Sequence, residues 1–197
     1  MDSLRDRVAT ALRRFERRPA DRTDLKRAAV AIALVDKGPA FLLTRRAATL
    51  RGHAGQWALP GGRTDPGETP GVAARRELAE ELGLVLGADD ELGMLDDYPT
   101  RSGYLITPVV VWAGADPQLT PNPAEVGELH QVPLDVIDVE PRFLTIPELD
   151  NPVIQIPLFG RFVHAPTAAV LYQFREVVLH GRATRVAHLE QPMFAWR

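Results

Sequence analysis

Hydrophobic and polar positions follow two different spacings in the first third of the chain. Residues 3–17 repeat apolar side chains every three or four positions, the pattern of an amphipathic helix, and Pro19 ends it. Residues 27–35 form a continuous apolar run, and a second run from Ala40 to Thr44 follows a Lys-Gly-Pro turn. We therefore expect an N-terminal helix followed by two strands joined by a turn.

The clearest helix signal follows a glycine-rich stretch at residues 51–62 and extends from Pro70 to Leu82. Thr69 suits the N-cap, because its hydroxyl can accept a hydrogen bond from a free backbone amide. Pro70 suits the first helical position. Gly83 ends the helix, since glycine adopts the left-handed conformation easily.

The rest of the chain mixes strands and helices without regular alternation. We expect strands at 92–98, 104–112 and 129–132, a loop at 116–125, a helical turn at 133–137 and a helix at 166–180. Residues 141–157 are interrupted by prolines and carry no assignment. This order favours an α/β sandwich with a mixed sheet, preceded by a helix and linker over residues 1–24 and forming a single domain over residues 25–197.

Composition excludes several classes of protein. The chain has 197 residues, 45% of them hydrophobic, and a net charge of -3, so no overall positive field attracts nucleic acid or an anionic membrane. It has no cysteine, which removes disulfides, thiol nucleophiles and zinc–thiolate sites and suits a reducing compartment. No apolar run reaches the ~18 residues of a membrane span. We expect a cytoplasmic protein without a membrane or nucleic-acid partner.

Three glutamates share one face of the predicted central helix. Glu77, Glu80 and Glu81 fall within an arc of about 100°. Like charges at this spacing repel, and the C-terminal end of a helix disfavours anions. A divalent cation such as Mg²⁺, which prefers oxygen ligands, would offset both effects. The alternative is a solvated acidic face neutralised by Arg75 and Arg76.

Glycines and a further glutamate precede this helix. Residues 59–62 are Leu-Pro-Gly-Gly, and residues 65–68 are Asp-Pro-Gly-Glu. A glycine pair lets the backbone approach a phosphate closely. Glu68, just before the helix, lies where a carboxylate is favoured and can reach a metal cluster through water.

Residues 62–84, GRTDPGETPGVAARRELAEELGL, resemble a complete Nudix box. That motif is G, five residues, E, seven residues, then R-E-U-x-E-E-x-G-U, where U is a bulky aliphatic residue. Its fixed positions are filled by Gly62, Glu68, Arg76, Glu77, Leu78, Glu80, Glu81, Gly83 and Leu84. The resemblance implies a Nudix hydrolase, an enzyme that cuts a diphosphate bond, with the family's α/β/α sandwich and mixed β-sheet.

The same resemblance implies a metal site. Glu77, Glu80 and Glu81 are similar to the family's metal ligands, and the Gly61 carbonyl joins them. The cofactor implied is Mg²⁺, with Mn²⁺ as its substitute. Glu68 is similar to the residue that supports the water at the metal, and Glu68 and Glu81 are both catalytic candidates.

The remaining motif positions and the general base complete the implied site. Arg76 is expected to pin the loop to the helix by an ion pair, and Gly62 and Gly83 are structural. Water attacks one phosphorus, and two or more metal ions lower the pKa of that water. Glu125 is our candidate for the base and Glu128 the alternative, with a carboxylate of the box and simple solvation of the loop left open.

Upstream residues indicate the substrate. Residues 42–62, LLTRRAATLRGHAGQWALPGG, resemble the coenzyme A pyrophosphatase signature L-L-T-x-R-[SA]-x3-R-x3-G-x3-F-P-G-G, with Leu59 in place of Phe. Downstream stretches are also similar, at 95–98, 102–104, 107–110, 122–126 and 132–134. The resemblance covers roughly residues 28–137. It implies that coenzyme A or acyl-coenzyme A is split into 3′,5′-ADP and (acyl-)4′-phosphopantetheine.

Four side chains are candidates for substrate binding. Arg45, Arg46 and Arg51 form a basic patch that suits the extra 3′-phosphate of coenzyme A. Trp57 suits stacking on adenine, and core packing is the alternative. One or two of the arginines, Arg45 first, can equally be plain surface residues.

Other functions remain open at this point. A different Nudix specificity, for ADP-ribose, a dinucleoside polyphosphate or a nucleoside triphosphate, shares the same box. A catalytically silent domain that senses nucleotides is the second alternative, although no box glutamate is missing. The expected partner is a small nucleotide diphosphate, and the protein is expected to be a monomer or homodimer.

Overall fold

A mixed β-sheet forms the centre of the molecule. The computed structural model of the chain describes residues 3–49 and 54–192. The strands of this sheet are β1 (Lys26–Val35), β2 (Ala40–Arg46), β3 (Trp57–Ala58), β4 (Gly61–Arg63), β5 (Glu91–Met94), β6 (Tyr98–Pro99), β7 (Tyr104–Gly114) and β8 (Val126–Pro133). The main order is β3-β2-β1-β7-β5, while β4 pairs with β1, β6 with β7 and β8 with β2. Strands β1 and β7 run parallel and the other pairs are antiparallel.

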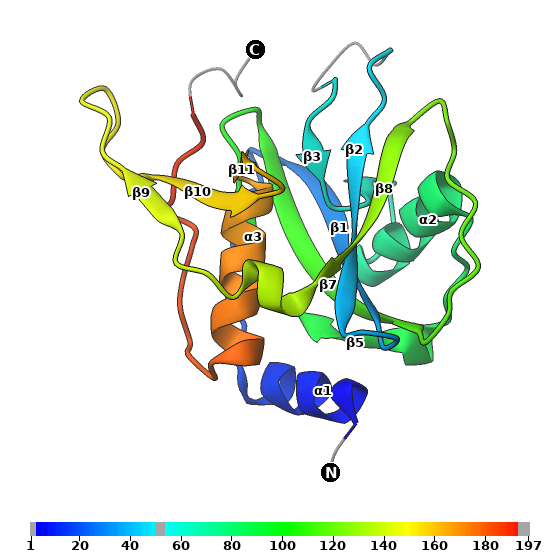
Figure 1. Cartoon of the computed structure of the whole chain (residues 1–197). Helices are drawn as coiled ribbons and strands as arrows, with labels where there is room; N and C mark the ends of the chain where they lie inside the picture. The colour runs from blue at the N-terminus through cyan, green and yellow to red at the C-terminus, as the bar shows by residue number, and fades with distance from the viewer. Residues whose placement is uncertain (1–2, 50–53, 193–197) are drawn as a thin grey trace.

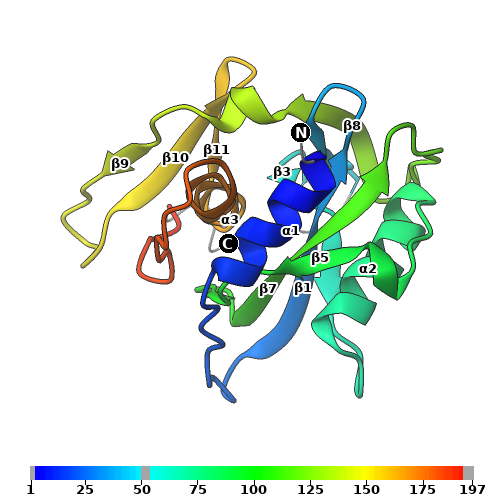
Figure 2. The same cartoon turned by 90° about the horizontal axis from the view of Figure 1, so that it is seen from below.

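Helices cover both faces of this sheet (Figures 1 and 2). They are α1 (Leu4–Arg14), α2 (Pro70–Leu82) and α3 (Thr167–Phe174), with short turns η1 (Ala88–Asp90) and η2 (Leu134–Ile137) and a π-helical turn η3 (Arg175–Leu179). Alternate residues of β1 face opposite layers: Ala31 and Ala33 pack with α2, whereas Ile32 and Leu34 pack with α1 and α3. This arrangement confirms the predicted α/β/α sandwich with a mixed sheet.

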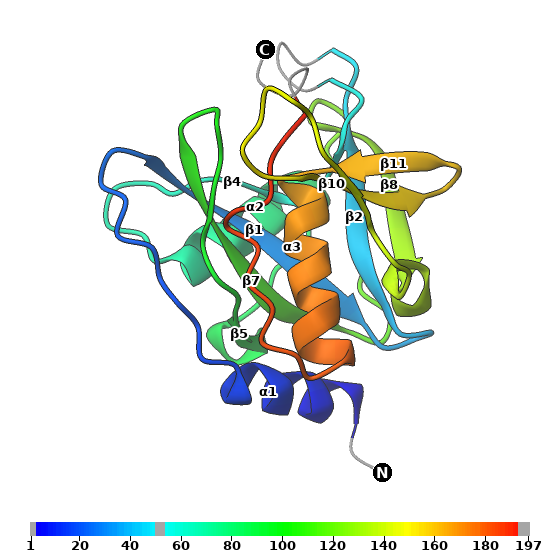
Figure 3. The same ribbon diagram turned by 90° about the vertical axis from the view of Figure 1, so that its left-hand side faces the viewer.

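A second, smaller sheet occupies the segment that the sequence left unassigned. It consists of β9 (Arg142–Leu144), β10 (Val153–Leu158) and β11 (Arg161–His164), with β10 antiparallel to both neighbours. It packs against α3 and projects from the main sheet (Figures 1 and 3). Pro141 and Pro152 of this region directly precede β9 and β10, and Pro157 lies within β10.

Helix α2 begins and ends where the sequence predicts. The Thr69 hydroxyl accepts a hydrogen bond from the Val72 amide at 3.3 Å, and Gly83 takes the left-handed conformation at φ 66°. Helix α1 ends earlier than expected, at Arg14, and buries Leu4 and other apolar side chains against the same chain, next to β5 and η3. No helix in the described residues is long and apolar enough to span a bilayer.

One sequence prediction of a regular element is wrong, and another is confirmed with a change of helix type. The single strand at 92–98 is broken, because Asp96 and Asp97 lie between β5 and β6 and are buried in ion pairs with Arg185 and Arg17. The predicted helix at 166–180 is confirmed in its extent, but it is α-helical only over Thr167–Phe174 and π-helical over Arg175–Leu179. Buried charged side chains lie in both places, Asp96 and Asp97 at the strand break and Arg175 and Glu176 in the π-helical turn, and the apolar pattern does not reveal them.

Candidate active site

The three glutamates of α2 differ strongly in exposure. Glu81 is buried at 4% exposure, whereas the Glu77 side chain is 12% exposed and the Glu80 side chain 54%. Within the described residues, no three acidic or histidine side chains converge closely enough to enclose a metal ion. The helix thus places the three carboxylates on one face, but at different depths.

Arg76 holds the more exposed carboxylates and the loop before the helix. Its Nε donates to Glu68 Oε1 at 2.9 Å, and its Nη1 donates to Glu77 at 2.8 Å and to Glu80 at 3.0 Å. Its Nη2 donates to the Arg63 carbonyl oxygen at 2.9 Å. These contacts hold the pKa of Glu68 below its usual range. In this structure, Arg76 neutralises the outer part of the acidic face and ties the loop to α2.

Arg75 does not share in this neutralisation. Its Nε donates to the Gly71 carbonyl oxygen at 3.1 Å, one turn earlier in the same helix. Of the two arginines in the alternative of a neutralised acidic face, only Arg76 pairs with the glutamates. The buried Glu81 has no ion pair with either arginine.

Glu81 is the buried carboxylate of the site. Its Oε1 accepts a hydrogen bond from the Gly61 amide at 3.5 Å, the long limit for such a bond. Burial raises the pKa of Glu81 to about 7, and the negative charges of Glu77 and Glu125 act in the same direction, against Arg46. A nearby divalent cation would favour the ionised form. Hard carboxylate oxygens in this setting fit Mg²⁺ or Mn²⁺.

The glycine pair allows β4 to pass between β1 and α2. Gly61 pairs with Val30, and a Cβ added at Gly61 would overlap the backbone of β1. A Cβ added at Gly62 would overlap the carboxylate of Glu77. Gly61 therefore requires glycine, because the backbone of β1 leaves no room for a side chain, whereas a side chain at Gly62 would displace the Glu77 carboxylate.

The loop before β8 brings Glu125 toward the helix glutamates. The Thr120 amide donates to the Leu82 carbonyl oxygen at 2.7 Å, and the Asn122 amide donates to the Glu81 carbonyl oxygen at 2.8 Å. The loop thereby satisfies free carbonyls at the end of α2. Asn122 Nδ2 donates to Glu125 Oε1 at 3.2 Å. The charge of Glu125 helps to raise the pKa of Glu81, so the two carboxylates lie in the same electrostatic environment.

Glu128 has different hydrogen-bond partners from Glu125. It lies opposite Arg45 in the β2–β8 register and accepts a hydrogen bond from Arg45 Nη1 at 2.9 Å. Its second oxygen is 3.1 Å from Nε2 of His130, and these contacts hold the pKa of Glu128 below its usual range. Arg45 also donates from Nε to the Gly55 carbonyl oxygen at 2.9 Å. The structure thus pairs Glu128 with Arg45 in a salt bridge.

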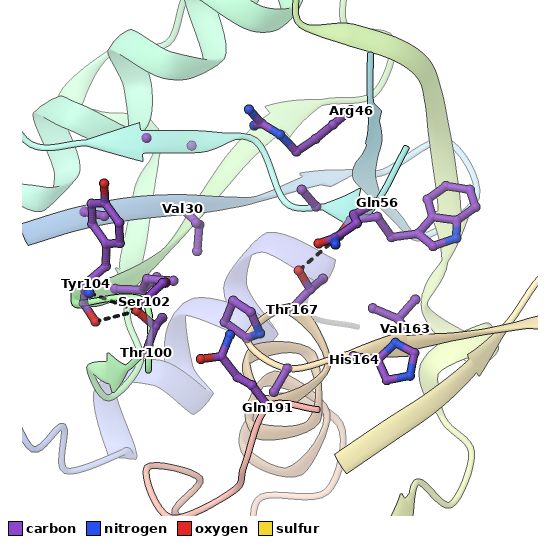
Figure 4. Close-up of a pocket in the computed structure, with 18 of the residues that line it drawn as sticks. Val30, Arg46, Gln56, Thr100, Ser102, Tyr104, Val163, His164, Thr167 and Gln191 are labelled. Carbon is purple, nitrogen blue, oxygen red and sulfur yellow. Dashed lines mark hydrogen bonds between the residues drawn. The ribbon is translucent and has the colours of Figure 1, made fainter. Parts of the chain in front are cut away.

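A pocket of about 610 Å³ adjoins the glycine pair. Its wall comes from β1, β3 and β4, from the turn between β6 and β7, from β11 and from the start of α3. Figure 4 shows Arg46 on one side of it, Thr100 and Gln191 across from it, and His164 on a third side. Arg46 Nε is buried without a hydrogen-bond partner among the described residues, and its charge also reaches Glu81. Arg46 therefore lines the pocket and also interacts electrostatically with Glu81.

Trp57 lines the same pocket but also belongs to an aromatic cluster. Its ring centroid lies 4.9 Å from that of His130 and 5.7 Å from that of Phe159. Arg51, the fourth candidate for substrate binding, lies outside the described residues.

Sequence reasoning missed several lining residues. Tyr104 lies within a stretch that resembles the coenzyme A pyrophosphatases, and its hydroxyl accepts a hydrogen bond from Arg63 Nε at 2.9 Å. Arg161, His164 and Gln191 also line the pocket. No motif marked these three, because they come from the last quarter of the chain, where the spacing of apolar residues gave no clear assignment.

Comparisons with known proteins identify the family. The NUDIX domain model matches residues 25–151. A protein of Photorhabdus laumondii named "Uncharacterized Nudix hydrolase NudL" is 43% identical over 111 residues, which cover 55% of this chain and 59% of that protein. A protein of the same name from Pectobacterium atrosepticum is 40% identical over 112 residues, covering 56% and 58%. The matches thus span less than two thirds of these curated relatives.

A solved structure supports the same assignment. The crystal structure of a Nudix hydrolase from M. smegmatis, RenU, superposes with a TM-score of 0.53 at 27% identity, over 78% of this chain and 86% of that one. The family model covers more than half of the chain and includes the glycine pair, the helix glutamates and Glu125. The chain belongs to the NUDIX domain family.

Proposed function

We propose that the chain is a divalent-metal-dependent hydrolase that cuts a diphosphate bond in a nucleoside diphosphate derivative. The observation that carries this proposal is Glu81, a buried carboxylate near two other carboxylates and beside the backbone of Gly61. Such a group is unfavourable in its ionised form unless a cation accompanies it. Family membership and the complete set of box glutamates support the same chemistry.

Metal binding and proton transfer are assigned to different residues of the chain. Glu77, Glu80 and Glu81 would hold the cation, Mg²⁺ or Mn²⁺, which would supply charge neutralisation and a lower pKa for the attacking water. The carbonyl oxygen of Gly61 would be a further ligand. Glu125 takes the proton from the water, because its carboxylate shares the electrostatic environment of Glu81.

Other side chains position the reacting groups. Glu68, which Arg76 holds in a two-point ion pair, fixes the loop before α2 and orients water at the site. Arg46 binds the diphosphate, since its guanidinium lines the pocket and acts on Glu81. Trp57 lines the pocket and packs on His130, while Arg45, paired with Glu128, supports the lining residue Gly55 through its carbonyl oxygen.

Coenzyme A or acyl-coenzyme A is the substrate that the sequence favours. Residues 42–62 resemble the coenzyme A pyrophosphatase signature, and Arg46 lies within it. The name of the NudL relatives adds no substrate. The expected products are 3′,5′-ADP and 4′-phosphopantetheine or its acyl form. Because residues 161–167 and Gln191 help to line the pocket, we also propose that residues 25–197 act as one domain, with the helix and linker of residues 1–24 attached to it.

A substrate panel tests this proposal. Purified protein is incubated with Mg²⁺ or Mn²⁺ and with coenzyme A, ADP-ribose, a dinucleoside polyphosphate or a nucleoside triphosphate, and the products are identified by mass. Turnover of coenzyme A to the two named products supports the full proposal. If ADP-ribose or a nucleotide turns over while coenzyme A does not, the substrate is wrong and the diphosphate chemistry stands. If nothing turns over, the silent, nucleotide-sensing alternative is favoured.

A further inference from the structure

One wall of the pocket comes from a part of the chain outside the family model. The model ends at residue 151, whereas residues 161–167, which comprise β11 and the start of α3, line the pocket. Strands β10 and β11 form a hairpin that projects beside the main sheet (Figure 3). The glutamates thus lie within the region that the family model covers, while this wall of the pocket lies C-terminal to that region.

The tip of the hairpin has an unusual backbone. Leu158 pairs with Arg161, so Phe159 and Gly160 form a two-residue turn with φ angles of 49° and 71°. Turns of this kind favour asparagine or glycine at both positions, because other side chains are strained at positive φ. A bulky residue in this conformation requires a compensating contact.

Aromatic contacts supply that compensation. The Phe159 ring lies 5.7 Å from the Trp57 ring on β3 and 5.3 Å from the His130 ring on β8, within the range of favourable aromatic pairs. Phe159 is nevertheless 51% exposed, so it joins the two sheets at the surface rather than filling a core. These contacts dock the hairpin tip onto two strands of the catalytic sheet.

Arg161 follows this turn directly and lines the pocket. It is exposed, and no acidic side chain in the described part of the chain forms an ion pair with it. Arg45, by contrast, is paired with Glu128. A guanidinium at a pocket wall without an acidic partner is suited to bind an anionic group of a ligand, above all a phosphate.

We propose that the β10–β11 hairpin is the substrate-selecting wall of this pocket, that Phe159 positions it through Trp57 and His130, and that Arg161 binds a substrate phosphate other than the scissile diphosphate. The inference rests on the proposed function, since it names the part of the substrate that the wall recognises. Arg46, near Glu81, remains at the diphosphate. Selectivity would then reside outside the residues that the family shares.

The positioning role of Phe159 is tested with two variants and a matched control. Phe159→Ala removes the ring, and Phe159→Asn removes it while suiting the left-handed backbone. Phe143→Ala is the control, because Phe143 is also exposed on the small sheet but contacts Tyr172 and does not line the pocket. Both Phe159 variants should raise the KM for coenzyme A roughly tenfold and change kcat little, since the glutamates are untouched. An unchanged KM in both variants, or an equal rise in Phe143→Ala, overturns this role.

The role of Arg161 is tested by comparing coenzyme A with dephospho-coenzyme A, which lacks the 3′-phosphate. Arg161→Ala should lower kcat/KM for coenzyme A roughly tenfold to a hundredfold, the effect of one lost charge-assisted hydrogen bond. Dephospho-coenzyme A should lose no more than about twofold, as in a distant charge control, Arg13→Ala on α1. Arg161→Lys, which keeps the charge, should recover part of the loss. Equal losses on both substrates overturn the inference and leave the proposed function intact.

If the wild-type protein hydrolyses no substrate, binding measurements still distinguish the role of Arg161 from the proposed function. The affinities of the wild-type protein and Arg161→Ala for 3′,5′-ADP and for 5′-AMP are measured by calorimetry in chelator. A loss specific to 3′,5′-ADP supports the inference even if the wild-type protein hydrolyses nothing, in which case only the proposed function fails. Equal affinities of the two proteins for 3′,5′-ADP overturn the inference.

Discussion

The buried carboxylate of Glu81 faces the backbone amide of Gly61, with 3.5 Å between Oε1 and the nitrogen. A single long hydrogen bond offsets little of the free energy lost when a carboxylate leaves water. The pKa of Glu81 is accordingly raised by burial, from its usual value of 4.5 to about 7. The same residue thus links stability to pH and, under the proposed function, to metal binding.

The stability of the metal-free protein should depend on the protonation of Glu81. The folded state binds this proton more tightly than the unfolded state, so the free energy of unfolding should fall as pH rises from 4.5 to about 7. The fall attributable to Glu81 is on the order of 3 kcal/mol. Urea unfolding in chelator at several pH values measures it, with Glu81→Gln as the reference that lacks the titrating group. Identical pH profiles in the two proteins would show that Glu81 titrates normally.

Arg76→Ala should destabilise the fold, whereas Arg75→Ala should not. Arg76 donates hydrogen bonds to Glu68, Glu77, Glu80 and the Arg63 carbonyl oxygen, and its removal leaves the partly exposed Glu68 and Glu77 without their cation. The expected loss is about 2 kcal/mol in metal-free protein. Arg75 makes one hydrogen bond to its own helix, so its loss should stay within about 0.5 kcal/mol. Urea unfolding distinguishes the two, and equal effects would refute the role of Arg76 in tying the loop to α2.

Glu125→Gln should slow turnover far more than Glu128→Gln. Glu125 acts on the pKa of Glu81, whereas Glu128 is paired with Arg45 and His130. Loss of a general base lowers kcat by roughly 10²- to 10⁴-fold with little change in KM. Steady-state kinetics across pH provide the measurement. Near-normal rates in both variants would instead place the base among the carboxylates of the Nudix box.

Gly62→Ala should weaken metal binding more than it weakens the fold. Its new methyl group would displace the Glu77 carboxylate, which is the flexible end of a side chain and can move at little energetic cost. Gly127→Ala is the matched control, because a methyl group there meets its nearest atom, in Ala47, at an ordinary 3.4 Å. Calorimetric titration with Mn²⁺ compares both with the wild-type protein. An unchanged affinity in Gly62→Ala would mean that Glu77 is not a ligand.

The sequence predicted the parts of the site that local rules determine. Thr69, Pro70 and Gly83 define α2 through capping chemistry, which acts over a few residues, and the spacing of its glutamates follows from the helical period. The parallel pairing of β1 with β7 could not be read in this way, since it joins strands separated by about 70 residues, although their apolar runs were recognised.

The sequence did not predict the features that depend on tertiary contacts. The break at Asp96 and Asp97 depends on arginines far away in the chain. The differing exposure of Glu77, Glu80 and Glu81 reflects how β4 and the loop before β8 pack on α2, which periodicity alone does not contain. Arg161 had no signal at all, because it enters the pocket only through the fold of the hairpin.

Metal-dependent catalysis by the glutamates is tested most directly by the hydrolysis rate of Glu81→Gln, with a substrate that the wild-type protein turns over in Mg²⁺ or Mn²⁺. Glutamine keeps the shape of the side chain and removes its charge, so in chelator at pH 7 the variant should stay folded and unfold at a higher denaturant concentration than the wild-type protein. Its kcat should fall by at least about a hundredfold, and chelation of divalent ions should abolish wild-type turnover. A folded Glu81→Gln protein that retains the wild-type rate would contradict the assignment of this helix as the metal-binding and catalytic element.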